Sequence, residues 1–236
     1  MGGFQGMFAS ATAPELGSAP VKAAVARAGI QADDVGEVLM GCVLPAGLGQ
    51  APARQASRGA GIPDAVPCTT VNKMCGSGMK TVMQAYDALH ARPREVIVAG
   101  GMESMTNAPY LLPKMRSGAR LGHAQAMDHM FLDGLEDAYD KGRLMGTYAE
   151  DTATHYQFTR EAQDAFALES LRRAKTANED GSFAPEITRP SSTIAATPTG
   201  KFEYGEDEWV RASFATPRRA SQSASVILKM RLSRVM

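Results

Sequence analysis

Apolar and polar positions follow two patterns along residues 1–105. Short runs rich in Val, Leu, Ile and Met predict buried strands, at residues 37–44, 66–71 and 95–99. Apolar positions at helical spacing predict helices at residues 13–28, 51–59 and 79–89. In the last helix the predicted apolar face consists of Met79, Val82, Met83, Tyr86 and Leu89. Because strand and helix alternate, we predict an α/β fold whose parallel or mixed sheet carries helices on both faces.

A proline interrupts the first predicted helix. Pro20 lacks the N–H that a helix interior uses, and its ring costs about 3 kcal/mol there. We therefore expect residues 13–28 either to begin their helix near Ser18 or to kink at the proline.

The pattern changes after residue 105. Residues 106–143 are irregular and rich in Met, Gly and Asp, with a helix expected at residues 128–140. Residues 145–158 contain a second short helix, and Thr159 is a suitable N-cap for a longer one that ends near residues 180–181. We expect loops and short strands at residues 182–208. The chain is thus divided into an α/β domain (1–105), a mostly helical unit (106–211) and a tail (212–236).

The tail differs from the rest of the chain in charge. Residues 209–236 contain six basic residues and no acidic one. Such a basic segment is compatible with a membrane surface or an acidic partner. We favour a simpler interpretation, an aberrant end of the coding sequence without an evolved role, and we expect it to be loosely packed.

Overall charge and cysteine content narrow the class of protein. With 25 basic and 25 acidic residues the formal net charge is zero, which disfavours nucleic acid and anionic membranes as partners. Three cysteines and no secretory leader at residues 1–10 favour free thiols in a reducing compartment, and we expect a cytoplasmic protein. No apolar run reaches the length that spans a membrane.

One cysteine lies where a predicted strand meets a predicted helix. Residues 72–80 have the sequence Asn-Lys-Met-Cys-Gly-Ser-Gly-Met-Lys, and we expect a helix to begin at or just after Cys75. A thiol near a helix N-terminus is easier to ionise, and the thiolate is the nucleophile. Gly76 and Gly78 leave space for an acyl group. A buried structural cysteine and a phosphate-binding glycine loop are the alternatives.

Residues 72–80 resemble the acyl-enzyme cysteine motif of the thiolases, the acetyl-CoA acetyltransferase and 3-ketoacyl-CoA thiolase family. Other segments resemble the family in the same order, at residues 14–17, 49–56, 98–105, 145–150 and 159–164. The resemblance implies a thiolase-like layered fold in which residues 106–211 form a loop domain over the CoA channel. It also implies that the first strand and the carboxy-terminal domain are missing.

The resemblance assigns chemistry to particular residues. Cys75 would be the acylated nucleophile, and its backbone N–H would bind the thioester oxyanion. Leu144 and Met145 would line the CoA channel, with Leu144 at a place where many biosynthetic members have histidine. We expect no bound cofactor and no metal, and coenzyme A thioesters as substrates. The family's histidine base and second cysteine lie in segments that this sequence does not contain, so we expect little turnover from this chain alone.

The function implied is acyl transfer through an acyl-cysteine, by reversible Claisen condensation of acetyl-CoA to acetoacetyl-CoA. Two alternatives stay open: a thiolase for longer 3-ketoacyl-CoA substrates, and a non-catalytic module that binds CoA or pairs with another subunit. Expected partners are acetyl-CoA or another acyl-CoA, and further copies of the chain in a dimer or tetramer.

Overall fold

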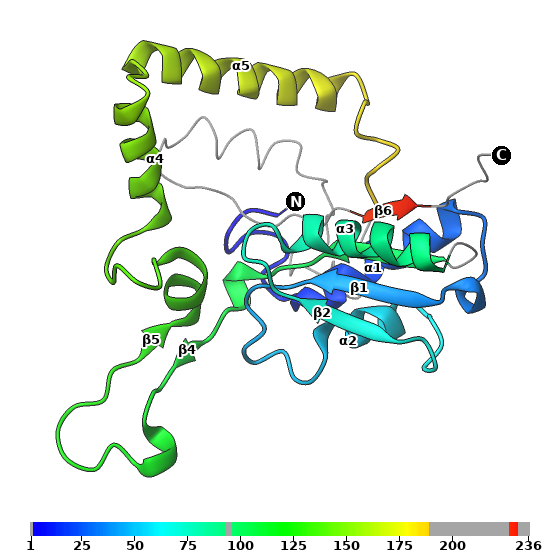
Figure 1. Ribbon diagram of the computed structural model, residues 1–236, viewed down its shortest axis with the longest axis horizontal. Coiled ribbons are helices and arrows are strands. Elements are labelled where there is room, and N and C mark those ends of the chain that lie inside the picture. The colour runs from blue at the N-terminus through cyan, green and yellow to red at the C-terminus, as the bar shows by residue number, and fades with distance from the viewer. Residues whose placement is uncertain (1, 93–95, 189–226, 231–236) are drawn as a thin grey trace.

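The computed structural model describes residues 2–92, 96–188 and 227–230. A four-stranded sheet lies at its centre (Figure 1). The strands are β1 (Glu37–Gly41), β2 (Cys68–Val71), β3 (Ile97–Gly101) and β6 (Ile227–Met230), in the order β2-β1-β3-β6. β1 is parallel to β2 and β3, and its Met40 is aligned with Thr70 and Gly100. β6 is antiparallel to β3. The predicted α/β sheet is therefore confirmed.

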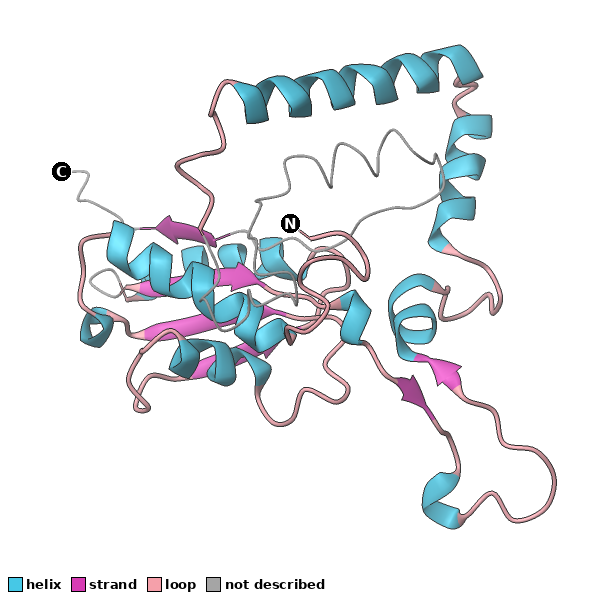
Figure 2. Ribbon diagram, turned by 180° about the vertical axis from the view of Figure 1, so that it is seen from behind, coloured by secondary structure: helices cyan, strands magenta, loops and turns pink. Residues whose placement is uncertain are grey.

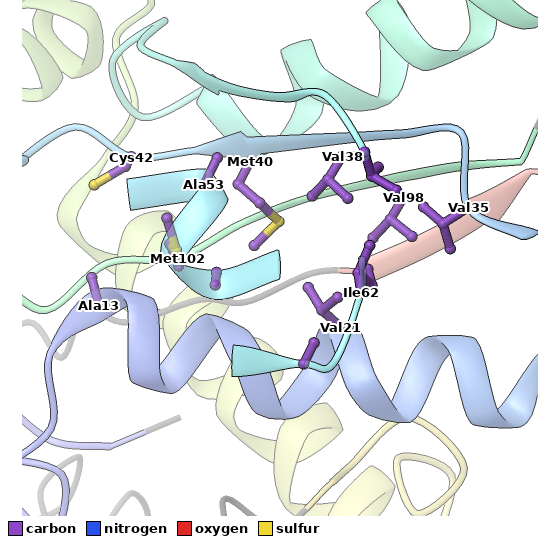
Figure 3. Close-up of a cluster of buried hydrophobic side chains, with 13 residues drawn as sticks. Ala13, Val21, Val35, Val38, Met40, Cys42, Ala53, Ile62, Val98 and Met102 are labelled. Carbon is purple, nitrogen blue, oxygen red and sulfur yellow. The ribbon is translucent and has the colours of Figure 1, made fainter. Parts of the chain in front are cut away.

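Helices cover both faces of this sheet. α1 (Ala13–Arg27) and α2 (Pro52–Gly59) pack on one face, and α3 (Ser77–Ala91) packs on the other. Val38 and Met40 of β1 belong to the core beneath α1 and α2 (Figure 3). Leu39, between them, packs with Ala85 and Leu89 of α3. The alternation along β1 is the period of two that places successive side chains on opposite faces.

The first helix begins at a capping box. Thr12 accepts a hydrogen bond from the Glu15 N–H at 3.4 Å, and the Glu15 carboxylate accepts one from the Thr12 N–H at 2.8 Å. The helix then runs through Pro20 to Arg27. Of the two alternatives considered for Pro20, a start near Ser18 is therefore excluded, because the helix begins at Ala13, five residues earlier.

Helix α3 buries only part of the face that the apolar pattern predicts, since Leu89 is buried and Val82 packs against the core, whereas the other three predicted residues do not. Its four buried side chains are small or aliphatic: Ser77, Thr81, Ala85 and Leu89. Met79, Met83 and Tyr86 are exposed, with Met79 at 72%. Because the glycine-rich ends of β1 and β3 admit only small groups, the helix turns its small side chains to the sheet. The larger apolar side chains remain on the outer face.

Residues 108–179 form an arm that extends away from the sheet, and the segment after residue 179 returns to it (Figures 1 and 2). A short antiparallel pair, β4 (Tyr110–Leu111) and β5 (Met127–Asp128), leads to a π-helix at Phe131–Leu135. The helix expected at residues 128–140 is thus reduced to residues 129–135, most of which form this π-helix. α4 (Met145–His155) and α5 (Arg160–Glu179) follow, and the predicted N-cap is confirmed, since Thr159 accepts a hydrogen bond from the Ala162 N–H at 3.2 Å.

In the described part of the chain, 3₁₀ turns connect the larger elements at Ala32–Asp34, Met105–Asn107 and Met115–Ser117. Of the tail, only Ile227–Met230 is described, and it pairs with β3. Our expectation of a loosely packed tail is wrong for these residues, and its remainder lies outside the described residues, as does most of the segment 182–208. Within the described residues no helix has the length and hydropathy to cross a membrane.

Candidate active site

Cys75 lies in the turn between β2 and α3, at the carboxyl edge of the parallel strands. Its side chain is exposed. Helix α3 begins at Ser77 with Gly76 as its N-cap, which confirms the predicted position of the helix start. Met74 has a φ of 50°, in the left-handed region that side chains rarely adopt. The chain therefore bends sharply just before the cysteine, and the buried structural cysteine considered for this position is excluded.

Two side chains hold this bend in place. Asn72 Oδ1 accepts a hydrogen bond from the Met74 N–H at 3.0 Å. Ser77 is buried, and its hydroxyl accepts a hydrogen bond from the Lys73 N–H at 2.8 Å and donates one to the Met74 carbonyl at 2.5 Å. The residues on both sides of Cys75 are thus tied together by side chains that point into the turn. This arrangement leaves the thiol accessible and the backbone beneath it fixed.

Glycines bring the start of α3 into contact with the sheet. A Cβ atom on Gly41, the last residue of β1, would lie 2.7 Å from the Ser77 carbonyl carbon. A Cβ atom on Gly101, at the end of β3, would lie 3.4 Å from the Gly78 Cα. A hydrogen bond also joins the helix to β3, because the Thr81 hydroxyl donates to the Gly100 carbonyl oxygen at 2.8 Å. The close approach fixes the position of the helix N-terminus, and with it the turn that carries Cys75.

The backbone around Cys75 leaves one donor unused. Among the described residues, none accepts a hydrogen bond from the Cys75 N–H, whereas the N–H groups of Gly76 and Ser77 donate to the Lys73 and Met74 carbonyls. The Cys75 thiol likewise forms no hydrogen bond within the described part of the chain, unlike the thiols of the other two cysteines. An exposed thiol and a neighbouring free N–H are the two groups that thioester chemistry needs from a nucleophile turn.

The four histidines lie at packing or surface positions. His123 and His155 are exposed on the arm. His90, at the end of α3, stacks on Tyr86 with ring centroids 4.3 Å apart. His129 is buried, and its Nδ1 lies 2.6 Å from the Asp133 carboxylate. None of these imidazoles contacts Cys75, so the described residues supply no histidine base for this thiol.

Cys42 and Cys68 differ from Cys75 in their surroundings. Cys42 follows β1 and is buried, and its thiol lies 3.6 Å from the Glu103 carboxylate. Burial, together with the negative charge of Glu103, raises the pKa of Cys42 to about 12. Cys68 is partly buried and lies 3.3 Å from the Val66 carbonyl oxygen. Cys42 belongs to the core, and Cys68 packs against it.

Glu103 lies at the same sheet edge as Cys75 and was not among the predicted site residues. It follows β3, and its two carboxylate oxygens accept hydrogen bonds from the Val43 N–H at 2.8 Å and the Leu44 N–H at 3.0 Å. Burial raises the pKa of this carboxyl group, and the two backbone donors act in the opposite direction. The one indication in the sequence is an acidic residue placed directly after an apolar strand, at the sheet edge where Cys75 also lies.

The other two predicted site residues lie on the arm. Leu144 is the N-cap of α4 and Met145 is its first residue, and both are partly exposed. Helix α4 stands away from the sheet in Figures 1 and 2. The structure therefore places Cys75 on the sheet domain and the Leu144–Met145 pair on a separate surface, and it does not bring them into contact. No cluster of three or more His, Cys, Asp or Glu side chains suited to a metal is found among the described residues.

Comparison with known proteins identifies the chain. The family described as thiolase, N-terminal domain, matches residues 1–215. The chain belongs to the thiolase family. The acetyl-CoA acetyltransferase of Cupriavidus necator is 50% identical over 187 residues, covering 79% of this thiolase chain and 47% of that protein. Acetyl-CoA acetyltransferase 2 of Arabidopsis thaliana is 47% identical over 225 residues, covering 91% of this chain and 55% of its own length.

The structural comparison gives the same family. Acat5 thiolase from Ascaris suum, solved in complex with coenzyme A, superposes with a TM-score of 0.76 at 38% sequence identity. The match covers 83% of this chain and 50% of that one. The thiolase chain described here therefore spans about half the length of the relatives that it matches.

Proposed function

We propose that this chain supplies the acyl-cysteine part of a thiolase, with acetyl-CoA and acetoacetyl-CoA as the substrates of the whole enzyme. Relatives named acetyl-CoA acetyltransferase support the reaction, and a solved thiolase neighbour in complex with coenzyme A supports the substrate class. The observation that carries the proposal is the exposed Cys75 in a braced turn at the N-terminus of α3, beside an unused N–H.

The proposed step is transfer of the acyl group from CoA to sulfur. The Cys75 thiolate attacks the thioester carbonyl carbon and forms a new carbon–sulfur bond. The carbonyl oxygen becomes an oxyanion, toward which the Cys75 N–H donates, and one such donor is worth about 3 kcal/mol in other enzymes. The intermediate then collapses with cleavage of the bond to CoA, which leaves as a thiolate and takes up the proton that Cys75 lost.

The second half of a Claisen condensation needs groups that the described residues do not place near Cys75. An acid or base must remove the α-proton of the second acetyl-CoA. No described histidine, Asp or Glu forms a hydrogen bond with the Cys75 thiol. We therefore propose that the 236-residue chain performs the acylation half-reaction slowly and shows little complete turnover.

Mass spectrometry after incubation with acetyl-CoA tests the acylation step. We expect one acetyl adduct on the peptide that contains Cys75, and none in the Cys75→Ser variant at neutral pH. Cys68→Ser is the matched control, because it removes a partly buried thiol at the other end of β2 and leaves the turn intact. The proposal fails if the adduct is as abundant in Cys75→Ser as in the unaltered chain.

For the arm we propose that Leu144 and Met145 line the apolar side of the CoA channel when the complete enzyme assembles. Two observations support this proposal: both side chains are apolar, and both are exposed at the start of α4. Leu144→His measures the contribution of the side chain to acyl preference. We expect this variant to lower the rate with longer acyl-CoA relative to acetyl-CoA, and an unchanged ratio would remove Leu144 from the channel.

A pairing module is a second candidate function, and one observation favours it. Met79, Met83 and Tyr86 form an exposed apolar strip on α3, next to the Cys75 turn. Exposed apolar strips mark surfaces that another chain or domain covers. Light scattering of the purified chain tests self-association, and we expect a dimer or larger oligomer that Met83→Glu dissociates. A module without acyl transfer would bind CoA in calorimetry and form no adduct on Cys75.

A further inference from the structure

The loop after β1 is held by a buried carboxylate from the end of β3. The two oxygens of Glu103 accept the N–H groups of Val43 and Leu44, at 2.8 Å and 3.0 Å. Val43 and Leu44 therefore leave the sheet ladder and turn toward Glu103. A carboxylate that accepts two consecutive backbone donors fixes the orientation of both peptide groups, because each N–H is directed at a different oxygen.

The same peptide segment contacts the nucleophile turn. The Val43 carbonyl oxygen accepts a hydrogen bond from Asn72 Nδ2 at 3.4 Å. The other end of that amide, Oδ1, accepts the N–H of Met74, whose left-handed backbone precedes Cys75. A continuous path of hydrogen bonds thus runs from Glu103 through Val43 and Asn72 to the residue next to the nucleophile.

The other end of this loop, at Ala46, is held by a residue of the arm instead of by Glu103. The Ala46 N–H lies 3.4 Å from His129 Nε2, and Nδ1 of the same ring lies 2.6 Å from the Asp133 carboxylate. His129 is buried at 5% exposure. The loop is therefore fixed at both ends, by Glu103 near β1 and by His129 on the arm, and it has little freedom to adjust if either contact is lost.

We infer that Glu103 is a positioning residue for Cys75: it sets the Val43 peptide, which orients Asn72, which in turn holds the bend at Met74. The inference rests on the proposed role of Cys75 as the acylated nucleophile. Glu103 itself does not touch the substrate in this scheme. Its loss leaves the thiol present but displaces the turn, and a displacement of about 1 Å costs up to about a hundredfold in rate.

Glu103→Gln in the full chain tests the path, because it removes one of the two acceptors and keeps the size of the side chain. We expect amide hydrogen exchange to become faster in peptides that cover residues 43–44 and 72–77. We also expect the limiting rate of Cys75 acetylation at saturating acetyl-CoA to fall about tenfold or more. The half-saturating acetyl-CoA concentration and the final acetylated fraction should stay unchanged, whereas partial unfolding would lower the final fraction.

Two further variants make the outcome specific. Glu15→Gln alters a carboxylate that accepts a backbone N–H elsewhere in the same domain, at Thr12, and should change neither measurement. Asn72→Asp keeps Glu103 and the acceptor for Met74 but loses the donor to Val43, so it should reproduce the faster exchange at residues 72–77. Unchanged exchange there in Glu103→Gln and Asn72→Asp would overturn the inference, whether or not Cys75 is acetylated in the unaltered chain.

Discussion

Replacement of Gly41 by alanine tests the close contact that places the nucleophile turn. The new methyl group would lie 2.7 Å from both the carbonyl carbon and the Cβ of Ser77, and 2.8 Å from the Gly78 nitrogen. Ordinary contact begins near 3.4 Å, so the start of α3 must retreat by about 0.7 Å. Two of the three atoms belong to backbone and cannot rotate away. Overpacking of this kind costs about 1–3 kcal/mol of unfolding free energy.

A change in the unfolded state offsets part of this loss of unfolding free energy in Gly41→Ala. Alanine restricts the unfolded chain more than glycine does, which stabilises by about 0.4–1 kcal/mol where the native conformation permits. We therefore expect Gly41→Ala to lose about 1–2 kcal/mol net. Gly78→Ala is the matched control, since its methyl group would find its nearest neighbours at 3.8 Å and would favour the helix by about 0.5–1 kcal/mol.

The buried Cys42 thiol provides the assay. Its alkylation in increasing urea, located by mass spectrometry, reports opening of the sheet domain alone, because Cys42 is 1% exposed in the folded state. The Gly41→Ala midpoint should fall and the Gly78→Ala midpoint should stay level or rise, and Gly41→Ala should acetylate Cys75 more slowly than the unaltered chain. Equal midpoints in the two variants would show that the start of α3 is not pressed against β1, and the argument for a fixed turn would fail.

Further predictions concern ionisation and hydrogen bonding. Because the pKa of the Cys42 thiol is raised from 9.0 to about 12, its contribution to stability is complete below pH 9.0 and is lost as pH rises toward 12. Cys42→Ala should therefore be less sensitive to alkali, by about 2 kcal/mol near pH 10.5 in urea titrations against the unaltered chain, and equal sensitivity would contradict burial of the thiol. Thr81→Val, which removes the hydrogen bond from the Thr81 hydroxyl to the Gly100 carbonyl, should lower the unfolding free energy by about 1 kcal/mol in the same titration, whereas no loss would show that the Thr81 hydroxyl does not hold α3 to the sheet. Thr159→Ala should cost about 1 kcal/mol in α5, seen as faster hydrogen exchange at residues 160–163, and unchanged exchange would contradict the cap.

The sequence pattern located the strands and helices of the sheet domain because periodicity of apolar residues is a local property. It placed the end of β1 too late, at residue 44 rather than Gly41. Residues 42–44 are as apolar as the strand, but the N–H groups of Val43 and Leu44 bond to Glu103, about 60 positions later. No local signal reports a partner so distant in the chain.

In the candidate site, features that depend on neighbouring residues were predictable and features that depend on distant residues were not. The glycine turn and the change of period located the helix start beside Cys75, which needed only neighbouring residues. The exposure of Met79, Met83 and Tyr86 on α3 was not predictable. It depends on Gly41 and Gly101, at the ends of two strands that meet α3 only in the fold. The role of Glu103 was missed for the same reason, since its charge alone gives no hint of its backbone partners.

Helix α5 has consequences for how the chain melts. It spans 20 residues without a single buried side chain. Helices that gain nothing from tertiary packing are marginal in water, so its integrity depends on its N-cap and on surface ion pairs such as Glu169 with Arg172 and Arg173. Heat and salt should therefore unwind α5 well before the sheet opens, and calorimetry of the chain should show two transitions instead of one.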